Sequence, residues 1–146
     1  MSEYRNLLNK LSLLAEKQDL KTLTSPSVVI DYLIAKNINN KDIEKMNILY
    51  LNVKNKVIEN YTIEGTVDRL IFYPREILKK ALLNNATSII ISHNHPSGEV
   101  DPSGEDIRIT DELKKCCKLF DISLLDHIIT CYGSNNYFSF QEESIL

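Results

Sequence analysis

The 146-residue sequence is poor in cysteine, glycine and proline and contains no long apolar run. The three cysteines, two of them adjacent, exclude a disulfide-stapled domain and indicate a reducing compartment. Four glycines and four prolines exclude collagen-like and low-complexity chains. No apolar run approaches the ~20 residues that span a bilayer, and the first residues lack a signal-peptide core. We therefore expect a cytoplasmic protein with no membrane partner.

The sequence also lacks an excess of positive charge. It has 17 Lys and Arg against 20 Asp and Glu, a net charge of −3, and an isoelectric point near 5.6. Residues 1–60 carry 9 basic and 7 acidic side chains (+2), whereas 61–146 carry 8 and 13 (−5). A surface that follows a nucleic-acid backbone is normally basic, so the charge argues against nucleic acid as a partner.

Apolar residues make up 43% of the chain, enough for one globular core. Their periodicity predicts two N-terminal helices, over 3–17 and from Pro26 to about 37, followed by a hairpin of strands over 46–53 and 57–63 with a turn at 54–56. A helix over 74–83 and a strand over 87–92 come next. The chain then continues with a helix that begins at 102–103 and ends with strands over 122–131 and 137–140. One face of the last helix is expected to carry Ile107, Thr110, Leu113, Cys117 and Phe120. This order predicts an α/β domain with a mixed sheet flanked by helices.

The end of the strand predicted over 87–92 carries two histidines, His93 and His95, followed by Pro96. Residues two apart on a strand share a face, so both imidazoles can reach one Zn²⁺ ion. Asp106, in the first turn of the next helix, is the natural third ligand, because a Gly- and Pro-containing loop can turn the chain back toward the histidines. Three protein ligands with a fourth position open are typical of a catalytic zinc site.

Each part of this pattern also has a plain structural interpretation. A His-x-His pair alone is a weak signal, and Ser103-x-x-Asp106 fits a helix capping box. We expect Asp106 to serve as a cap or as a ligand, but not as both. The combination His93-x-His95-Pro96 followed by Ser103-x-x-Asp106 is far more specific than its parts.

That combination resembles the JAMM motif of MPN-type metalloproteases, and more narrowly the RadC-like branch of that superfamily. Further similar stretches are 65–68, 74–77, 124–129 and 137–140, and the resemblance covers roughly residues 40–146. It implies a three-layer MPN/JAMM (cytidine-deaminase-like) domain over 41–146, with a short N-terminal helical extension over 1–40. Longer RadC-like proteins carry an additional helix-hairpin-helix-like region that has no counterpart here, which weakens any inherited link to DNA.

The resemblance implies a role for five residues. His93, His95 and Asp106 would bind one zinc ion, and Ser103 would donate a hydrogen bond to the oxyanion of a tetrahedral intermediate. The motif also requires an upstream glutamate as general base, and alignment by strand register places Glu44 at that position. The rivals for this role are Glu59, Glu64 and Glu76. The implied reaction is hydrolysis of a peptide or isopeptide bond in a peptide or protein substrate.

Two other functions remain open at this point: a binding module that keeps the fold without turnover, and a DNA repair or recombination protein. The sequence lacks the His-x-Glu and Pro-Cys-x-x-Cys motifs of nucleobase deaminases and the His-Glu-x-x-His helix of zincins. The third histidine, His127, is expected to be a buried residue that supports the site rather than a direct ligand. The oligomeric state is open, with a homodimer as one alternative.

Overall fold

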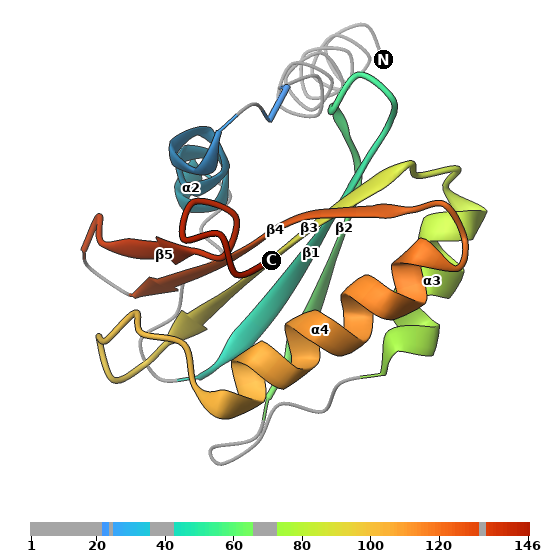
Figure 1. The fold of residues 1–146 in the computed structure, drawn as a ribbon. Helices are drawn as coiled ribbons and strands as arrows, with labels where there is room; N and C mark the ends of the chain where they lie inside the picture. The colour runs from blue at the N-terminus through green and yellow to red at the C-terminus, as the bar shows by residue number, and fades with distance from the viewer. Residues whose placement is uncertain (1–21, 24, 36–42, 66–72, 132–133) are drawn as a thin grey trace, which may run out of the picture.

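A computed structural model describes residues 22–23, 25–35, 43–65, 73–131 and 134–146. It shows one mixed sheet of strand order β2-β1-β3-β4-β5 with helices on both faces (Figure 1). The elements are α2 (Pro26–Ala35), β1 (Lys45–Leu51), β2 (Val57–Glu64), α3 (Pro74–Leu83), β3 (Ser88–His95), α4 (Gly104–Lys118), β4 (Ser123–Cys131) and β5 (Tyr137–Ser139). The predicted α/β class and mixed sheet are confirmed, while the helix predicted over 3–17 lies outside the described residues.

The sheet begins with a hairpin whose turn is built by asparagines. Asn52 Oδ1 accepts hydrogen bonds from the backbone N–H groups of Lys54 (2.9 Å) and Lys56 (3.1 Å), and Asn55 has a left-handed φ of 56°. Asparagine tolerates this conformation because its short polar side chain bonds locally to the backbone. The turn predicted at 54–56 therefore joins β1 to its antiparallel neighbour β2.

Strand β3 lies in the middle of the sheet and is buried on both faces. Ile89 and Ile91 pack with α3 and α4, whereas Ile90 packs with α2 on the opposite face. This alternation gives three layers, with α2 on one face of the sheet and α3 and α4 on the other (Figure 1). Since side chains two residues apart share a face, His93 and His95 lie on the α4 side. None of the helices in these described ranges is long and apolar enough to cross a bilayer.

Helix α4 buries Thr110, Leu113 and Cys117, which share the predicted face, but not Ile107 or Phe120. The residues it buries are Asp106, Ile109, Thr110, Leu113 and Cys117. Ile107 is instead 42% exposed, because it follows Asp106 by one residue and is rotated about 100° around the helix axis. Phe120 is 51% exposed and lies beyond the helix, which ends at Lys118. The prediction was wrong at these two positions.

A β-bulge in β4 changes which side chains face α4. Ile89 pairs with Leu124, but Ile90 pairs with Asp126, so Leu125 is an extra residue in the ladder. The bulge shifts the alternation by one position. As a result Leu124 and His127, three residues apart, both face α4 instead of lying on opposite faces of the sheet.

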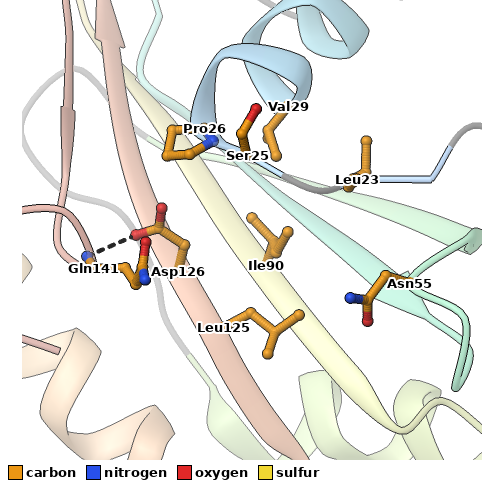
Figure 2. Close-up of a pocket in the computed structure, with 9 residues that line it drawn as sticks. All are labelled: Leu23, Ser25, Pro26, Val29, Asn55, Ile90, Leu125, Asp126 and Gln141. Carbon is orange, nitrogen blue, oxygen red and sulfur yellow. Dashed lines mark hydrogen bonds between the residues drawn. The ribbon is translucent and has the colours of Figure 1, made fainter.

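On the α2 face a cavity of about 190 Å³ is lined by Asp126 and Gln141, among other residues (Figure 2). Burial raises the pKa of the Asp126 carboxyl, against the hydrogen bonds that this carboxyl accepts. Its Oδ1 accepts from the backbone N–H groups of His127 (2.7 Å) and Gln141 (3.0 Å), and its Oδ2 accepts from the Ser139 hydroxyl (2.6 Å). Asp126 therefore fastens the C-terminal turns to β4, and we assign it a structural role.

Two buried serines offer a matched test of these contacts. The Ser139 hydroxyl donates to Asp126 and accepts from the backbone N–H of Glu142 (3.1 Å), whereas Ser92 Oγ has no hydrogen-bond partner in the described part of the chain. We expect Ser139→Ala to lower the free energy of unfolding by about 1–3 kcal/mol, because it orphans a buried acceptor. Ser92→Ala should leave that free energy unchanged or raise it. Urea unfolding of both variants measures the difference, and equal destabilisation would contradict the assignment.

Candidate metal centre

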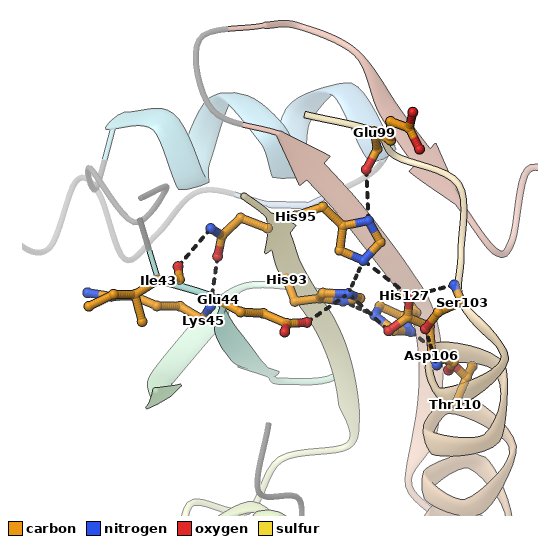
Figure 3. A network of polar contacts seen from close by, with 11 residues as sticks. Ile43, Glu44, Lys45, His93, His95, Glu99, Ser103, Asp106, Thr110 and His127 are labelled. Atoms are coloured by element: carbon orange, nitrogen blue, oxygen red, sulfur yellow. Dashed lines mark hydrogen bonds and ion pairs between the residues drawn. The ribbon is translucent and has the colours of Figure 1, made fainter. Parts of the chain in front are cut away.

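Three segments meet at one end of the sheet and bring four possible ligands together (Figure 3). His93 and His95 end β3, Asp106 lies in the first turn of α4, and Glu44 immediately precedes β1. One ligand atom from each of these residues lies within 4.8 Å of the other three. The crossover from β3 to the parallel strand β4 through α4 places the helix N-terminus beside the C-terminal end of β3.

The two histidines face each other through their Nε2 atoms, which are 2.9 Å apart. The His93 Nε2 atom lies 3.1 Å from Asp106 Oδ1, and the His95 Nε2 atom lies 3.2 Å from Asp106 Oδ2. Glu44 Oε1 approaches His93 Nε2 to 3.7 Å. The sequence-predicted residues His93, His95, Asp106 and Glu44 are thus brought together.

Asp106 takes part in the cap of its helix and faces the histidines at the same time, so capping does not turn its carboxylate away from the cluster. The Ser103 N–H donates to Asp106 Oδ2 (2.8 Å) and the Asp106 N–H donates to Ser103 Oγ (3.1 Å), which completes a capping box. A carboxylate has about four lone-pair sites on two oxygens, enough for both roles. Burial raises the pKa of Asp106, but the close contacts with His93 and His95 outweigh burial and hold the pKa well below its ordinary value.

The loop after β3 orients the ring of His95. Its Nδ1 lies 2.8 Å from the backbone carbonyl oxygen of Glu99, which only accepts, so Nδ1 carries the proton. Gly98 adopts a left-handed φ of 84°, a conformation that favours glycine in this turn. The hydrogen bond with Asp106 raises the pKa of His95, against the opposing effect of burial. In the neutral ring the Nε2 lone pair points into the cluster.

The side chain of Asn94 holds the segment around Glu44 through two hydrogen bonds to its backbone. Asn94 Oδ1 accepts from the Lys45 N–H (2.8 Å) and its Nδ2 donates to the carbonyl of Ile43 (3.0 Å). These bonds flank Glu44, whose own carbonyl accepts from the Gly65 N–H (2.9 Å). Sequence reasoning missed Asn94, although its place between the two histidines was a signal.

The three rival glutamates lie elsewhere. Glu64 pairs with Lys45 at 3.1 Å, and Glu76 lies 3.6 Å from Arg75 in the first turn of α3. Glu59 Oε1 accepts from the backbone N–H of Asn60. The His93–His95–Asp106 group therefore has Glu44 as its neighbouring glutamate within the described residues.

The Asn94 contacts predict a local effect on the segment that carries Glu44. In Asn94→Ala the Lys45 N–H loses its acceptor and the Ile43 carbonyl loses its donor, which is expected to cost about 1–3 kcal/mol. Amide hydrogen exchange should accelerate at Lys45, while the amide of Tyr50, deep in β1, serves as the control. Unchanged protection of Lys45 in a folded variant would contradict this account.

His127 lies behind His93, as expected of a supporting residue. It is fully buried, its Nε2 is 2.7 Å from His93 Nδ1, and its ring stacks on Phe140 with centroids 4.6 Å apart. Its Nδ1 lies 2.6 Å from the hydroxyl of Thr110. Burial lowers the pKa of His127 well below its ordinary value, so the ring is neutral. Thr110, which the sequence had placed on the apolar stripe, is thus part of the polar network.

The chemistry of the cluster fits a divalent metal ion. Two imidazole nitrogens and two carboxylates converge, and both histidine Nε2 atoms face acceptors instead of donors. Such a concentration of lone pairs and negative charge requires a cation, either an added proton or a metal ion. Nitrogen and oxygen ligands of this kind suit zinc and also other first-row metals.

A mixed sheet with a His-x-His pair at a strand end and an aspartate at the following helix N-terminus defines a JAB/MPN-type domain. The family model described as "RadC-like JAB domain" matches residues 23–145, and the chain belongs to that family. This match begins before residue 40, where the resemblance noted from the sequence begins, and it includes α2.

Curated relatives agree with this assignment. The chain is 43% identical over 134 residues to UPF0758 protein FN0909 of Fusobacterium nucleatum, covering 91% of this chain and 56% of that protein. A UPF0758 protein of Histophilus somni is 40% identical over 137 residues, 93% of this chain and 60% of its own. A UPF0758 protein of Chlorobium chlorochromatii is 38% identical over 131 residues, which cover 89% of this chain and 58% of that protein. The chain therefore spans a little over half the length of these relatives.

Proposed function

We propose that the protein is a zinc-dependent metallopeptidase or isopeptidase that hydrolyses an amide bond. The observation that carries the proposal is the convergence of His93, His95, Asp106 and Glu44 within 4.8 Å at the end of the sheet. His93, His95 and Asp106 would hold the metal ion. Membership of the RadC-like JAB domain family supports this function.

A metal ion in this cluster would supply Lewis acidity, which makes water a stronger acid and polarises a substrate carbonyl. Glu44, next to His93, accepts a proton from the attacking water as the new C–O bond forms. It then returns this proton to the leaving nitrogen as the C–N bond breaks. The products are a carboxylic acid and an amine, which together carry both protons of the water and exist at neutral pH as a carboxylate and an ammonium group.

Ser103 has the complementary role of stabilising negative charge. Its Oγ accepts from the Asp106 N–H, so its own hydroxyl proton is free to point toward a developing oxyanion. The side chain is exposed at the edge of the cluster, where a substrate can reach it. A positioned donor of this kind stabilises the tetrahedral transition state.

The substrate proposed is a peptide or protein, and the net charge of −3 argues against nucleic acid. Cys116, Cys117 and Cys131 are free thiols, which supports action in the cytoplasm. Burial raises the pKa of Cys117 to about 12, so this thiol is inert as a nucleophile.

The test is a cleavage screen with zinc-loaded protein and a library of linear and lysine-branched peptides. Mass spectrometry should detect new termini that are absent when the same protein is stripped of metal. A zinc-loaded protein that cleaves nothing in the library would favour the alternative, a binding module that has kept the site without turnover.

A further inference from the structure

A line of three short hydrogen bonds leads from His93 back to the helix that carries Asp106. His93 Nδ1 lies 2.7 Å from His127 Nε2, and His127 Nδ1 lies 2.6 Å from Thr110 Oγ1. The Thr110 hydroxyl donates to the backbone carbonyl of Asp106 at 2.7 Å. Figure 3 shows these three side chains side by side. Each is at most 2% exposed, so bulk water does not compete for these bonds.

The far end of this line sets the direction of every bond in it. The Asp106 carbonyl oxygen only accepts, so it takes the single hydroxyl proton of Thr110. Thr110 Oγ1 then accepts from Nδ1–H of His127, and the other nitrogen of that neutral ring, Nε2, accepts. His93 must therefore donate through Nδ1–H, and its Nε2 keeps a lone pair directed at Asp106 and His95.

We propose that Thr110 and His127 are positioning residues that hold His93 in its Nδ1–H tautomer, so that its Nε2 is ready to bind a metal ion. The inference rests on the proposed function in one respect, namely that His93 Nε2 is a metal ligand. The hydrogen-bond direction set at the Asp106 carbonyl leaves His93 Nε2 unprotonated, and a metal ion bound to Nε2 requires that same state. Partners of this kind fix the tautomer and the orientation of metal-binding histidines.

The opposite direction would weaken metal binding. It would take the Thr110 proton away from the Asp106 carbonyl and place a proton on His93 Nε2, which a metal ion must displace. Thr110 lies one helical turn after Asp106, so the same helix supplies one ligand and orients another. The bulge at Leu125 makes this possible, because it turns His127 toward α4.

The test compares zinc affinity in Thr110→Val, which keeps the shape of the side chain and removes the hydroxyl, with Thr110→Ser, which keeps the hydroxyl. Competition against a chromophoric chelator should show about 10–100-fold weaker binding for Thr110→Val and near-normal binding for Thr110→Ser. Ser92→Ala is the matched control, since it removes a buried hydroxyl that has no partner in the described residues. A folded Thr110→Val protein that binds zinc like the wild type would overturn the proposal.

A spectroscopic measurement tests the same proposal without any variant. In zinc-loaded wild-type protein, long-range ¹H–¹⁵N correlation should show His127 protonated on Nδ1 and unprotonated on Nε2. A proton on His127 Nε2 would overturn the proposal even if the protein is an active hydrolase. A protein that binds zinc, shows this tautomer and loses zinc affinity in Thr110→Val supports the proposal even if no peptide is cleaved. Failure of the positioning role and failure of the proposed hydrolase function can therefore be told apart.

Discussion

Zinc-loaded Glu44→Gln protein is expected to lose about 10²–10⁴-fold in the rate of amide hydrolysis while keeping its metal. Glutamine has nearly the same shape as glutamate, but it cannot accept a proton from water at neutral pH. The side chain lies 3.7 Å from His93 Nε2, beside the proposed ligands, and the other three members of the cluster remain unchanged. Initial rates on a peptide found in the cleavage screen, with zinc content measured on the same samples, give the result.

Glu64→Gln and Glu76→Gln serve as controls for this prediction. Both side chains are glutamates outside the cluster, paired with Lys45 and Arg75 respectively. Their substitution should leave the hydrolysis rate within a few-fold of the wild type, as is usual for exposed ion pairs. Wild-type rates in Glu44→Gln, or loss of activity in Glu76→Gln, would assign the general base to another residue.

Substitution of Asp106 is expected to weaken zinc binding by more than about 100-fold, because even the hydrogen-bond partners of metal ligands typically contribute 10–100-fold. Asp106→Asn removes the negative charge but retains an oxygen that can accept from the Ser103 N–H. Asp106→Ala removes both the ligand and the cap. Chelator competition for zinc, together with urea unfolding of the metal-free proteins, separates the two roles.

The two variants should therefore bind zinc equally poorly but differ in stability. Asp106→Ala is expected to be about 1 kcal/mol less stable than Asp106→Asn, the usual contribution of a helix cap. If Asp106→Asn retains wild-type zinc affinity, the carboxylate is a cap only. Equal stability of the two metal-free variants would instead show that the capping contact contributes nothing.

Much of the fold was predictable because local signals mark its boundaries. Pro74 begins α3 where the sequence places it, and the asparagine-rich turn at 54–56 joins β1 and β2. The strand predicted over 87–92 continues to His95, because His93 still pairs with β1 and all three residues after 92 pair with β4. Helix periodicity failed at Ile107, which lies one residue away from the buried stripe, and at Phe120, which lies beyond the end of α4.

The site was predictable where its residues are close in sequence. His93 and His95 follow from strand alternation, and Asp106 follows from the cap that opens α4. Glu44 needed strand register, because no signature surrounds it. The sequence does not show that the carboxylate that completes the capping box also faces both histidines.

The supporting network could not be derived from the sequence. It depends on the bulge at Leu125, because in a strand that alternated regularly from Leu124 the side chain of His127 would face α2. Thr110 reaches His127 only because α4 packs across that part of the sheet. Similarly, Asn94 holds the segment before β1 from 49 residues away in sequence.

The most direct test of the account is the metal content of the wild-type protein, purified without chelator and without a histidine tag. Inductively coupled plasma mass spectrometry should find close to one zinc ion per chain, as expected for a site with three protein ligands. His95→Ala, purified in the same way, should contain almost none. A wild-type protein that is isolated without metal and stays empty during zinc titration would contradict the account.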